Sequence, residues 1–270
     1  MTRANLDRVI DWAAADGWTP GLSDAEAFHA ADPAGSLMGW LGETPVTAIS
    51  VVRHSERFGF LGFYLCVPEY RGQGHGWATW QAGLAHLGAR TIGLDGVAAQ
   101  QGAYRRSGFA MAHQTQRYGG RVAPRADPAC AVARPEDLPE LLALDRRIGG
   151  GVARERCLGA WFRSTPWRVT LVRREVALGT SWACHQGHKI GPLLAPDAAS
   201  ARTMIQALVA EADADAEEVF IDSPDANPTA VALVAELDLT SAFACPRMYK
   251  GTAPPRDLAR IFGEASFELG

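Results

Sequence analysis

The stretch VPEYRGQGHG, residues 67–76, lies between an apolar run and an amphipathic segment. The run at 60–67 is typical of a buried strand, and residues 77–88 repeat large apolar side chains at helical spacing. A glycine-rich turn that joins a strand to a helix leaves backbone N–H groups unpaired at the helix start, where the helix dipole adds partial positive charge. The stretch therefore predicts a binding site for an anion such as a phosphate.

The residues of this turn also indicate how close a phosphate could come. Gly72, Gly74 and Gly76 have no Cβ, so the backbone can adopt positive φ and approach a ligand closely, and Arg71 adds a cation. The turn contains neither the G-x-G-x-x-G pattern of dinucleotide-binding folds nor the G-x-x-x-x-G-K-[ST] pattern of the P-loop. A different class of phosphate-bearing ligand is expected.

A second motif follows at a suitable distance. Residues 91–95 (TIGLD) predict another strand, and residues 103–109 (AYRRSGF) form a Y-x-x-x-G-F segment. The two motifs, R-x-x-G-x-G and then Y-x-x-x-G-F, resemble in type and order those of the GNAT superfamily of N-acetyltransferases. The alternative is a glycine turn that only starts a helix.

The resemblance implies that acetyl-CoA is the co-substrate and that no metal takes part. It places the pantetheine arm beside the strand that ends at 65–67, where the backbone N–H of Cys66 or Val67 would polarise the thioester carbonyl. The cofactor-binding residues that it implies are Leu65, Cys66, Val67, Arg71, Gly72, Gln73, Gly74, His75, Gly76 and Gln101.

Two catalytic residues are expected. Tyr104 occupies the place where the superfamily has its general acid, and its phenol could protonate the departing thiolate. Asp95, at the end of the 91–95 strand, is the first candidate for the general base. The alternatives are a core aromatic role for Tyr104 and a turn-capping role for Asp95. Asp222 occupies the matching place in the second half of the chain, which favours the capping role.

The order of predicted elements indicates an α+β fold with a mixed sheet, built from two GNAT-like domains in tandem. Prolines, glycines and charges at 119–128 predict a linker, so the domains are placed at 1–122 and 129–270. The usual first strand of the superfamily is absent or very short, because almost nothing precedes the first predicted helix.

The second half repeats the pattern of the first. Pro68 and Pro196 are 128 positions apart, and Asp95 and Asp222 are 127 positions apart. The second half lacks a glycine loop after Pro196 and has an aliphatic residue, Val231, near the place of Tyr104. It is therefore expected to be a degenerate domain that shapes the acceptor site or stabilises the first domain. One wall of that site is expected to consist of Trp18, Trp40, Phe63 and Tyr64.

Composition limits the classes of partner. The 270 residues carry a net charge of −4 without a basic tract, which argues against nucleic acid as a partner. No apolar run reaches membrane-spanning length, and no signal peptide is evident, so a cytoplasmic protein without a membrane partner is expected. Five dispersed cysteines predict no disulfide framework. Gly187 predicts a hairpin turn between His185 and His188 in place of a metal site.

These features together predict an acetyl-CoA-dependent N-acetyltransferase that acts on the primary amine of a small molecule by direct attack in a ternary complex. One alternative is a non-catalytic acyl-CoA sensor with a C-terminal effector domain, and another is a protein or peptide N-acetyltransferase. The chain is expected to be a monomer, as an internal pseudo-dimer, or a homodimer.

Overall fold

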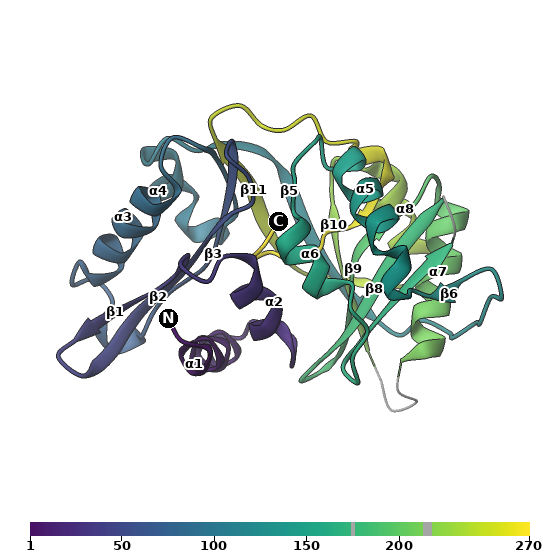
Figure 1. Cartoon of the computed structure of the whole chain (residues 1–270), viewed down its shortest axis with the longest axis horizontal. Coiled ribbons are helices and arrows are strands. Elements are labelled where there is room, and N and C mark those ends of the chain that lie inside the picture. The colour runs from purple at the N-terminus through teal and green to yellow at the C-terminus, as the bar shows by residue number, and fades with distance from the viewer. Residues whose placement is uncertain (174–175, 213–217) are drawn as a thin grey trace.

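The computed structural model describes residues 1–173, 176–212 and 218–270, and its strands join in one mixed sheet that runs through both halves of the chain (Figure 1). This architecture confirms the predicted α+β fold. The first half contributes, in chain order, α1 (Arg3–Ala15), α2 (Asp24–Ala31), β1 (Ser36–Leu41), β2 (Thr44–Arg53), β3 (Phe58–Cys66), α3 (His75–Leu87), β4 (Thr91–Asp95), α4 (Gln101–Arg106) and β5 (Ala110–Gly120). As expected, no strand precedes α1 in this part of the chain.

The second half repeats much of this order. Its elements are β6 (Ala131–Val132), α5 (Leu138–Ile148), α6 (Glu155–Trp161), β7 (Arg168–Arg173), β8 (Ala177–Cys184), β9 (Gly187–Leu194), α7 (Ala198–Glu211), β10 (Val219–Pro224), α8 (Pro228–Glu236), β11 (Thr240–Lys250) and β12 (Ile261–Gly263). The turn between β8 and β9 is the hairpin that the sequence predicts near Gly187.

The two halves exchange their last long strands. The sheet order is β1-β2-β3-β4-β11-β5-β10-β9-β8-β7-β6, so β11 of the second half pairs with β4 of the first, and β5 of the first half pairs with β10 of the second. The predicted division at 122 and 129 falls in the coil after β5, yet the sheet does not divide there. A fragment that ends at residue 122 would lack the strand that completes its own sheet.

A buried ion pair accompanies each exchanged strand. Arg247 on β11 donates to both carboxylate oxygens of Asp95 on β4, at 2.7 and 2.5 Å. Arg117 on β5 donates to both oxygens of Asp222 on β10, at 2.6 Å each. Both arginines are 2% exposed. The recurrence of an aspartate at these two places in the sequence therefore has a structural reason, which is to bind the arginine of the exchanged strand.

Helices from both halves also share one hydrophobic core. The cluster that contains Val9 and Phe28 of the first half continues through Leu144 and Trp161 of the second. Asp24 at the start of α2 accepts a hydrogen bond of 3.2 Å from Arg168 on β7, and both side chains are buried. A shared core and a shared sheet hold the halves as one folding unit.

The end of the chain lies inside the molecule. Residues 261–270 are all buried, and the C label in Figure 1 lies near the centre, between the two halves. Strand β12 pairs with β9, and the following backbone passes so close to β9 that a Cβ on Gly191 would lie 1.9 Å from the carbonyl oxygen of Glu264. Glycine at 191 is required by this contact.

The variant Gly191→Ala is expected to lower the free energy of unfolding by about 1–3 kcal/mol, because the added methyl group overlaps a backbone oxygen that cannot move without displacing β12. Gly159→Ala is the matched control. Gly159 lies within α6, and a Cβ added there would meet no atom within 4 Å, so alanine is expected to be neutral or stabilising. Urea unfolding measures both, and equal stability of the two variants would contradict the packing described.

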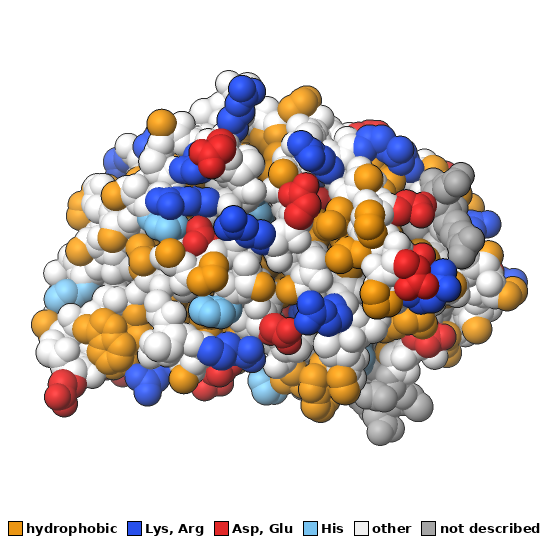
Figure 2. Space-filling model, viewed as in Figure 1, with side chains coloured by type: hydrophobic (Ala, Val, Ile, Leu, Met, Phe, Trp, Pro, Cys, Tyr) orange, Lys and Arg blue, Asp and Glu red, His pale blue; other side chains and the backbone are white. Residues whose placement is uncertain are grey.

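One face of the molecule shows no dominant sign of charge. On the face in Figure 2, acidic and basic side chains are interspersed. None of the helices within the described ranges is long and apolar enough to span a membrane.

Candidate functional site

A cleft opens in the first half where β3 and β4 separate. The two strands pair in parallel only between Phe58–Leu61 and Thr91–Leu94. Beyond this segment β3 bends, since Phe63 has φ of +43° and the pairing with β2 shifts register between Ala48 and Ser50. A positive φ is unfavourable for phenylalanine, so the surrounding structure must impose it. The bend leaves one edge of β3 without a partner strand and creates space beside it.

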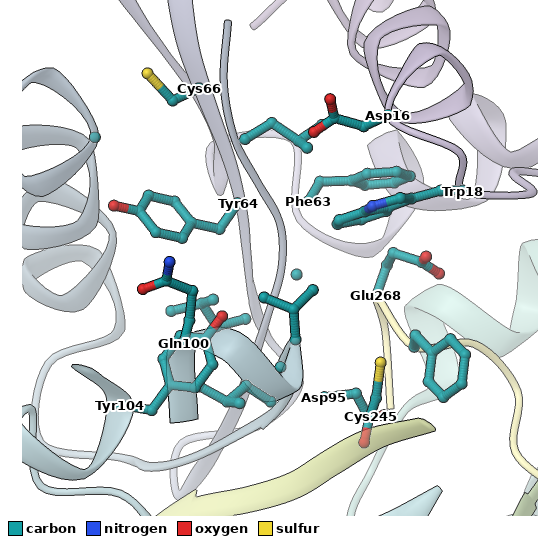
Figure 3. Close-up of a pocket in the computed structure, with 18 of the residues that line it drawn as sticks. Asp16, Trp18, Phe63, Tyr64, Cys66, Asp95, Gln100, Tyr104, Cys245 and Glu268 are labelled. Carbon is teal, nitrogen blue, oxygen red and sulfur yellow. The ribbon is translucent and has the colours of Figure 1, made fainter. Parts of the chain in front are cut away.

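This space is a pocket of about 580 Å³ with walls from both halves (Figure 3). From the first half it is lined by β3, the glycine loop, the end of β4 and Tyr104. The second half contributes Phe243 and Cys245 from β11, and Phe267 and Glu268 from the chain end. Of the four aromatic residues expected in one wall of the acceptor site, Trp18, Phe63 and Tyr64 line this pocket, whereas Trp40 is half-exposed on β1 and is not among the lining residues.

The glycine loop has the geometry of an anion cradle. Gly72 has φ of +75° and Gly74 has φ of +87°, and a Cβ on either would meet no atom within 4 Å. Gly74 is the N-cap of α3 and no side chain caps this helix, whose first internal bond runs from Ala78 N–H to Gly74 O at 3.1 Å. The N–H groups of the first turn are left for a ligand. A phosphate of acyl-CoA fits this loop, because backbone donors and open space coincide there.

The side chains of the loop are partly engaged elsewhere. Arg71 donates to both carboxylate oxygens of Asp16, at 2.9 and 2.7 Å, and to the carbonyl oxygen of Cys66 at 2.9 Å. The amide of Gln73 donates to Glu69 O at 2.9 Å. The guanidinium of Arg71 therefore fixes the loop to the strand end and to α1, and its charge is shared with Asp16.

Of the two backbone amides proposed for the thioester carbonyl, only one faces the cleft. The N–H of Val67 donates to Val46 O on β2 at 3.0 Å, so it is not available. Backbone groups alternate in direction along a strand, which turns the N–H of Cys66 toward the unpaired edge. Burial raises the pKa of the Cys66 thiol, which disfavours a thiolate nucleophile at this position.

Tyr104 lies in the floor of the pocket. Its ring stacks on Trp80 with centroids 5.7 Å apart. A Cβ added to Gly96 would lie only 2.2 Å from the same ring, so packing on both sides fixes the position of Tyr104. Burial raises the pKa of Tyr104 to about 12, against an opposing effect of the backbone of Val97. The phenol therefore keeps its proton at neutral pH, as a general acid must.

Asp95 also reaches the pocket, but its carboxylate is not free. The side chain is fully buried, both oxygens accept hydrogen bonds from Arg247, and burial raises the pKa of Asp95 to about 6 against the opposing effect of Arg247. Proton uptake by Asp95 would break a buried ion pair that joins two strands. The geometry thus argues against Asp95 as the general base, and it shows an ion pair in place of the turn-capping alternative.

The remaining predicted residues divide into two groups. Leu65, Cys66, Arg71, Gly72, Gly74 and Gly76 line the pocket, whereas Val67, Gln73, His75 and Gln101 do not. Gln101 lies in α4 with its amide 3.0 Å from the sulfur of Met111, and its neighbour Gln100 faces the pocket instead. The described ranges contain no group of three or more His, Cys, Asp or Glu side chains placed to hold a metal ion.

The pocket residues from the second half, which are Phe243, Cys245, Phe267 and Glu268, were not predicted from the sequence. Two of them, Phe243 and Phe267, pack on each other with ring centroids 5.5 Å apart, and both contact the buried guanidinium of Arg117 on β5, 4.8 Å from each centroid. The sequence did contain a sign of the two buried arginines. Arg117 and Arg247 are separated along the chain by nearly the same number of residues as Asp95 and Asp222. No local pattern marks Phe267 or Glu268, which come from a short irregular segment.

Comparison with known proteins supports the fold. Residues 141–263 match the family model described as an acetyltransferase (GNAT) domain. The putative acetyltransferase from Pyrococcus horikoshii, 20% identical, superposes with a TM-score of 0.85 over 100% of this chain and 94% of its own. A tandem GNAT protein from the clavulanic acid biosynthesis pathway, 13% identical, gives a TM-score of 0.63 over 95% of this chain and 96% of its own. The chain therefore has the GNAT fold.

A sequence relative covers nearly the whole chain. The holothin acyltransferase of Pseudoalteromonas sp. (strain SANK 73390) is 27% identical over 267 residues, which are 97% of this chain and 90% of the relative. The match to the GNAT family model falls on the second half, while the glycine loop and Tyr104 lie in the first. The matched region is thus the half that lacks the glycine loop.

Proposed function

We propose that this chain, which carries a GNAT acetyltransferase domain, is an acetyl-CoA-dependent N-acetyltransferase that acts on the primary amine of a small molecule. The observation that carries the proposal is the continuity between the glycine loop and the pocket of about 580 Å³, which contains Tyr104 and is closed by the second half. The similarity to a protein named holothin acyltransferase supports acyl transfer as the reaction. The second half serves as the wall of the acceptor site.

The roles of the chain's own residues follow from their positions. Backbone N–H groups at Gly74 and the first turn of α3 would hold the phosphates, and the N–H of Cys66 would bind the carbonyl oxygen of the acyl group. Acetyl-CoA supplies an activated thioester. The two walls would hold the amine against it, so that proximity provides much of the rate. Tyr104 would donate its proton to the sulfur as the C–S bond breaks.

Release of free thiol from acetyl-CoA tests this function. The purified chain is incubated with a panel of small primary amines, holothin among the compounds tested, and the thiol is measured with a chromogenic disulfide. Turnover that depends on one class of amine supports the proposal. Binding of acetyl-CoA without turnover on any amine would favour the acyl-CoA sensor instead.

The pH dependence of kcat carries a further expectation. Tyr104 must be protonated to act as an acid, and its pKa near 12 keeps it protonated at all lower pH values. The rate should therefore rise with pH as the acceptor amine loses its proton and should not fall again up to about pH 10. A decline between pH 8 and 10, with the protein still folded by circular dichroism, would contradict the assignment of Tyr104.

A further inference from the structure

The chain fills one of its two clefts with its own backbone. In the second half, β9 and β10 pair in parallel over only three positions, as β3 and β4 do over four. The gap beyond them is occupied by β12, which pairs with β9 on one side. On the other side Ser223 donates to Phe262 O at 2.7 Å, and Glu264 N–H donates to Asp222 O at 2.8 Å. The matching gap in the first half is the open pocket.

The residues that follow β12 run from this filled cleft into the first half. We call residues 264–270 the tail. Its backbone lies against β3, where a Cβ on Gly62 would be 2.4 Å from Glu268 O, and the carbonyl of Leu269 lies 3.0 Å from the ring nitrogen Nε2 of His54. Burial lowers the pKa of His54 to about 3, so the ring is neutral and donates to this carbonyl. Contacts with both halves therefore hold the tail.

The tail places one carboxylate in the pocket. Three acidic residues line the pocket, and two of them are paired, Asp16 with Arg71 and Asp95 with Arg247. Within the described ranges Glu268 forms no ion pair, and its carboxylate accepts a hydrogen bond from Ser266. Figure 3 shows Glu268 below Trp18, on the opposite side of the view from Tyr64 and Tyr104.

The nearest charges do not neutralise Glu268. Arg117 is close enough for Glu268 to contribute to the raised pKa of the guanidinium, but its Nε and one terminal nitrogen bind Asp222 and the other terminal nitrogen binds Thr19. Glu268 is 6% exposed. A buried carboxylate without a cationic partner costs free energy unless a bound cation completes it.

We propose that Glu268 binds the acceptor amine and takes its proton, and that the second half has become the anchor that positions this residue through β12. The inference rests on the proposed function. The incoming ammonium group gives one proton to Glu268 and becomes the neutral amine. The N–C bond then forms and the C–S bond breaks, and Tyr104 protonates the sulfur and regains a proton from the nitrogen through solvent. Glu268 releases its proton to solvent, so the products are one amide, one thiol and one proton.

The test compares Glu268→Gln with the full-length wild-type chain on two acceptors of different basicity. Glutamine keeps the size of the side chain and the hydrogen bond with Ser266. With an alkylamine that is protonated at the assay pH, kcat/KM should fall by about 10²–10⁴-fold. With a weakly basic amine that is already neutral, the fall should be less than about tenfold, since no ammonium proton must be removed. Glu268→Asp should recover part of the activity.

Each outcome decides whether Glu268 removes the proton of the amine or has only a structural role. Equal losses on both amines would overturn the proposal, because a structural defect does not depend on amine basicity, and unchanged kinetics would overturn it as well. Calorimetry with acetyl-CoA distinguishes a failure of the proposed function from a failure of this inference. A wild-type chain that binds acetyl-CoA without turning over any amine contradicts the proposed function, whereas normal turnover by Glu268→Gln contradicts only this inference.

A second variant tests the anchor from outside the pocket. Ser223→Ala removes the hydrogen bond to Phe262 O and should raise the KM for the acceptor by up to about tenfold while the Kd for acetyl-CoA stays unchanged. Thr203→Ala on the exposed face of α7 is the control and should leave both constants unchanged. Identical acceptor KM values for the two variants would show that the anchor does not position Glu268.

Discussion

Tyr104→Phe is expected to lower kcat by about 10²–10⁴-fold and to leave the Kd for acetyl-CoA unchanged. The substitution removes the phenol proton that the departing thiolate needs. It keeps the ring that stacks on Trp80 and packs against Gly96, so the floor of the pocket should retain its shape. Thiol-release kinetics measure kcat, and calorimetry measures the affinity.

Tyr64→Phe provides the matched control for this prediction. Tyr64 also lines the pocket, but a Cβ on Gly76 would lie 2.9 Å from its hydroxyl, which places that hydroxyl at the start of α3. Its loss should affect acetyl-CoA affinity more than kcat. If Tyr104→Phe retains the wild-type kcat, Tyr104 has only a packing role and another group must protonate the thiolate.

Arg247→Met is expected to lower the free energy of unfolding by about 3–5 kcal/mol, because it leaves the buried carboxylate of Asp95 without its partner. Glu264 lies 3.7 Å from the same guanidinium, so its carboxylate would lose one of two neighbouring positive charges and keep the ion pair with Arg256. Arg117→Met should have an effect of similar size through Asp222, because the two pairs hold the two exchanged strands. Urea unfolding followed by fluorescence and by circular dichroism measures both.

A surface ion pair supplies the control for these arginines. Arg202 and Glu236 are paired at the surface, so Arg202→Met should change the free energy of unfolding by less than about 1 kcal/mol. Coincident transitions by the two probes are also expected, because the halves share one sheet. A loss below about 1 kcal/mol for Arg247→Met would show that the buried pair is not what holds the exchanged strand.

The sequence predicted local structure and the conformation of the glycine loop well, because both depend on short patterns. Apolar runs and helical spacing identified β3, α3 and β4, and the glycines at 72 and 74 have the positive φ that their lack of a Cβ allows. The strand exchange could not be predicted. The alternating pattern of β5 is the same whether the strand pairs with β4 or with β10, and only the long-range geometry decides.

The candidate site shows the same limit. Asp95 lies beside the pocket as its place at a strand end indicated, but its partner Arg247 comes from the other half, 152 residues away. Their residue types alone would predict that Glu268 and Ser266 lie at the surface. They are buried because the tail runs between the two halves. Local sequence patterns cannot predict roles that depend on contacts between the halves.

The central claim is that the chain binds one molecule of acetyl-CoA, at the glycine loop of the first half, while the second half no longer can. Calorimetric titration tests it most directly, with Gly74→Glu against two matched variants. Gly42 also has positive φ and open space, but in the β1–β2 turn, and Ala199 is exposed at the start of α7. One site per chain is expected for the wild type, Gly42→Glu and Ala199→Glu, and no detectable binding for Gly74→Glu. Two sites in the wild type, normal binding by Gly74→Glu, or loss of binding in Ala199→Glu would contradict the account.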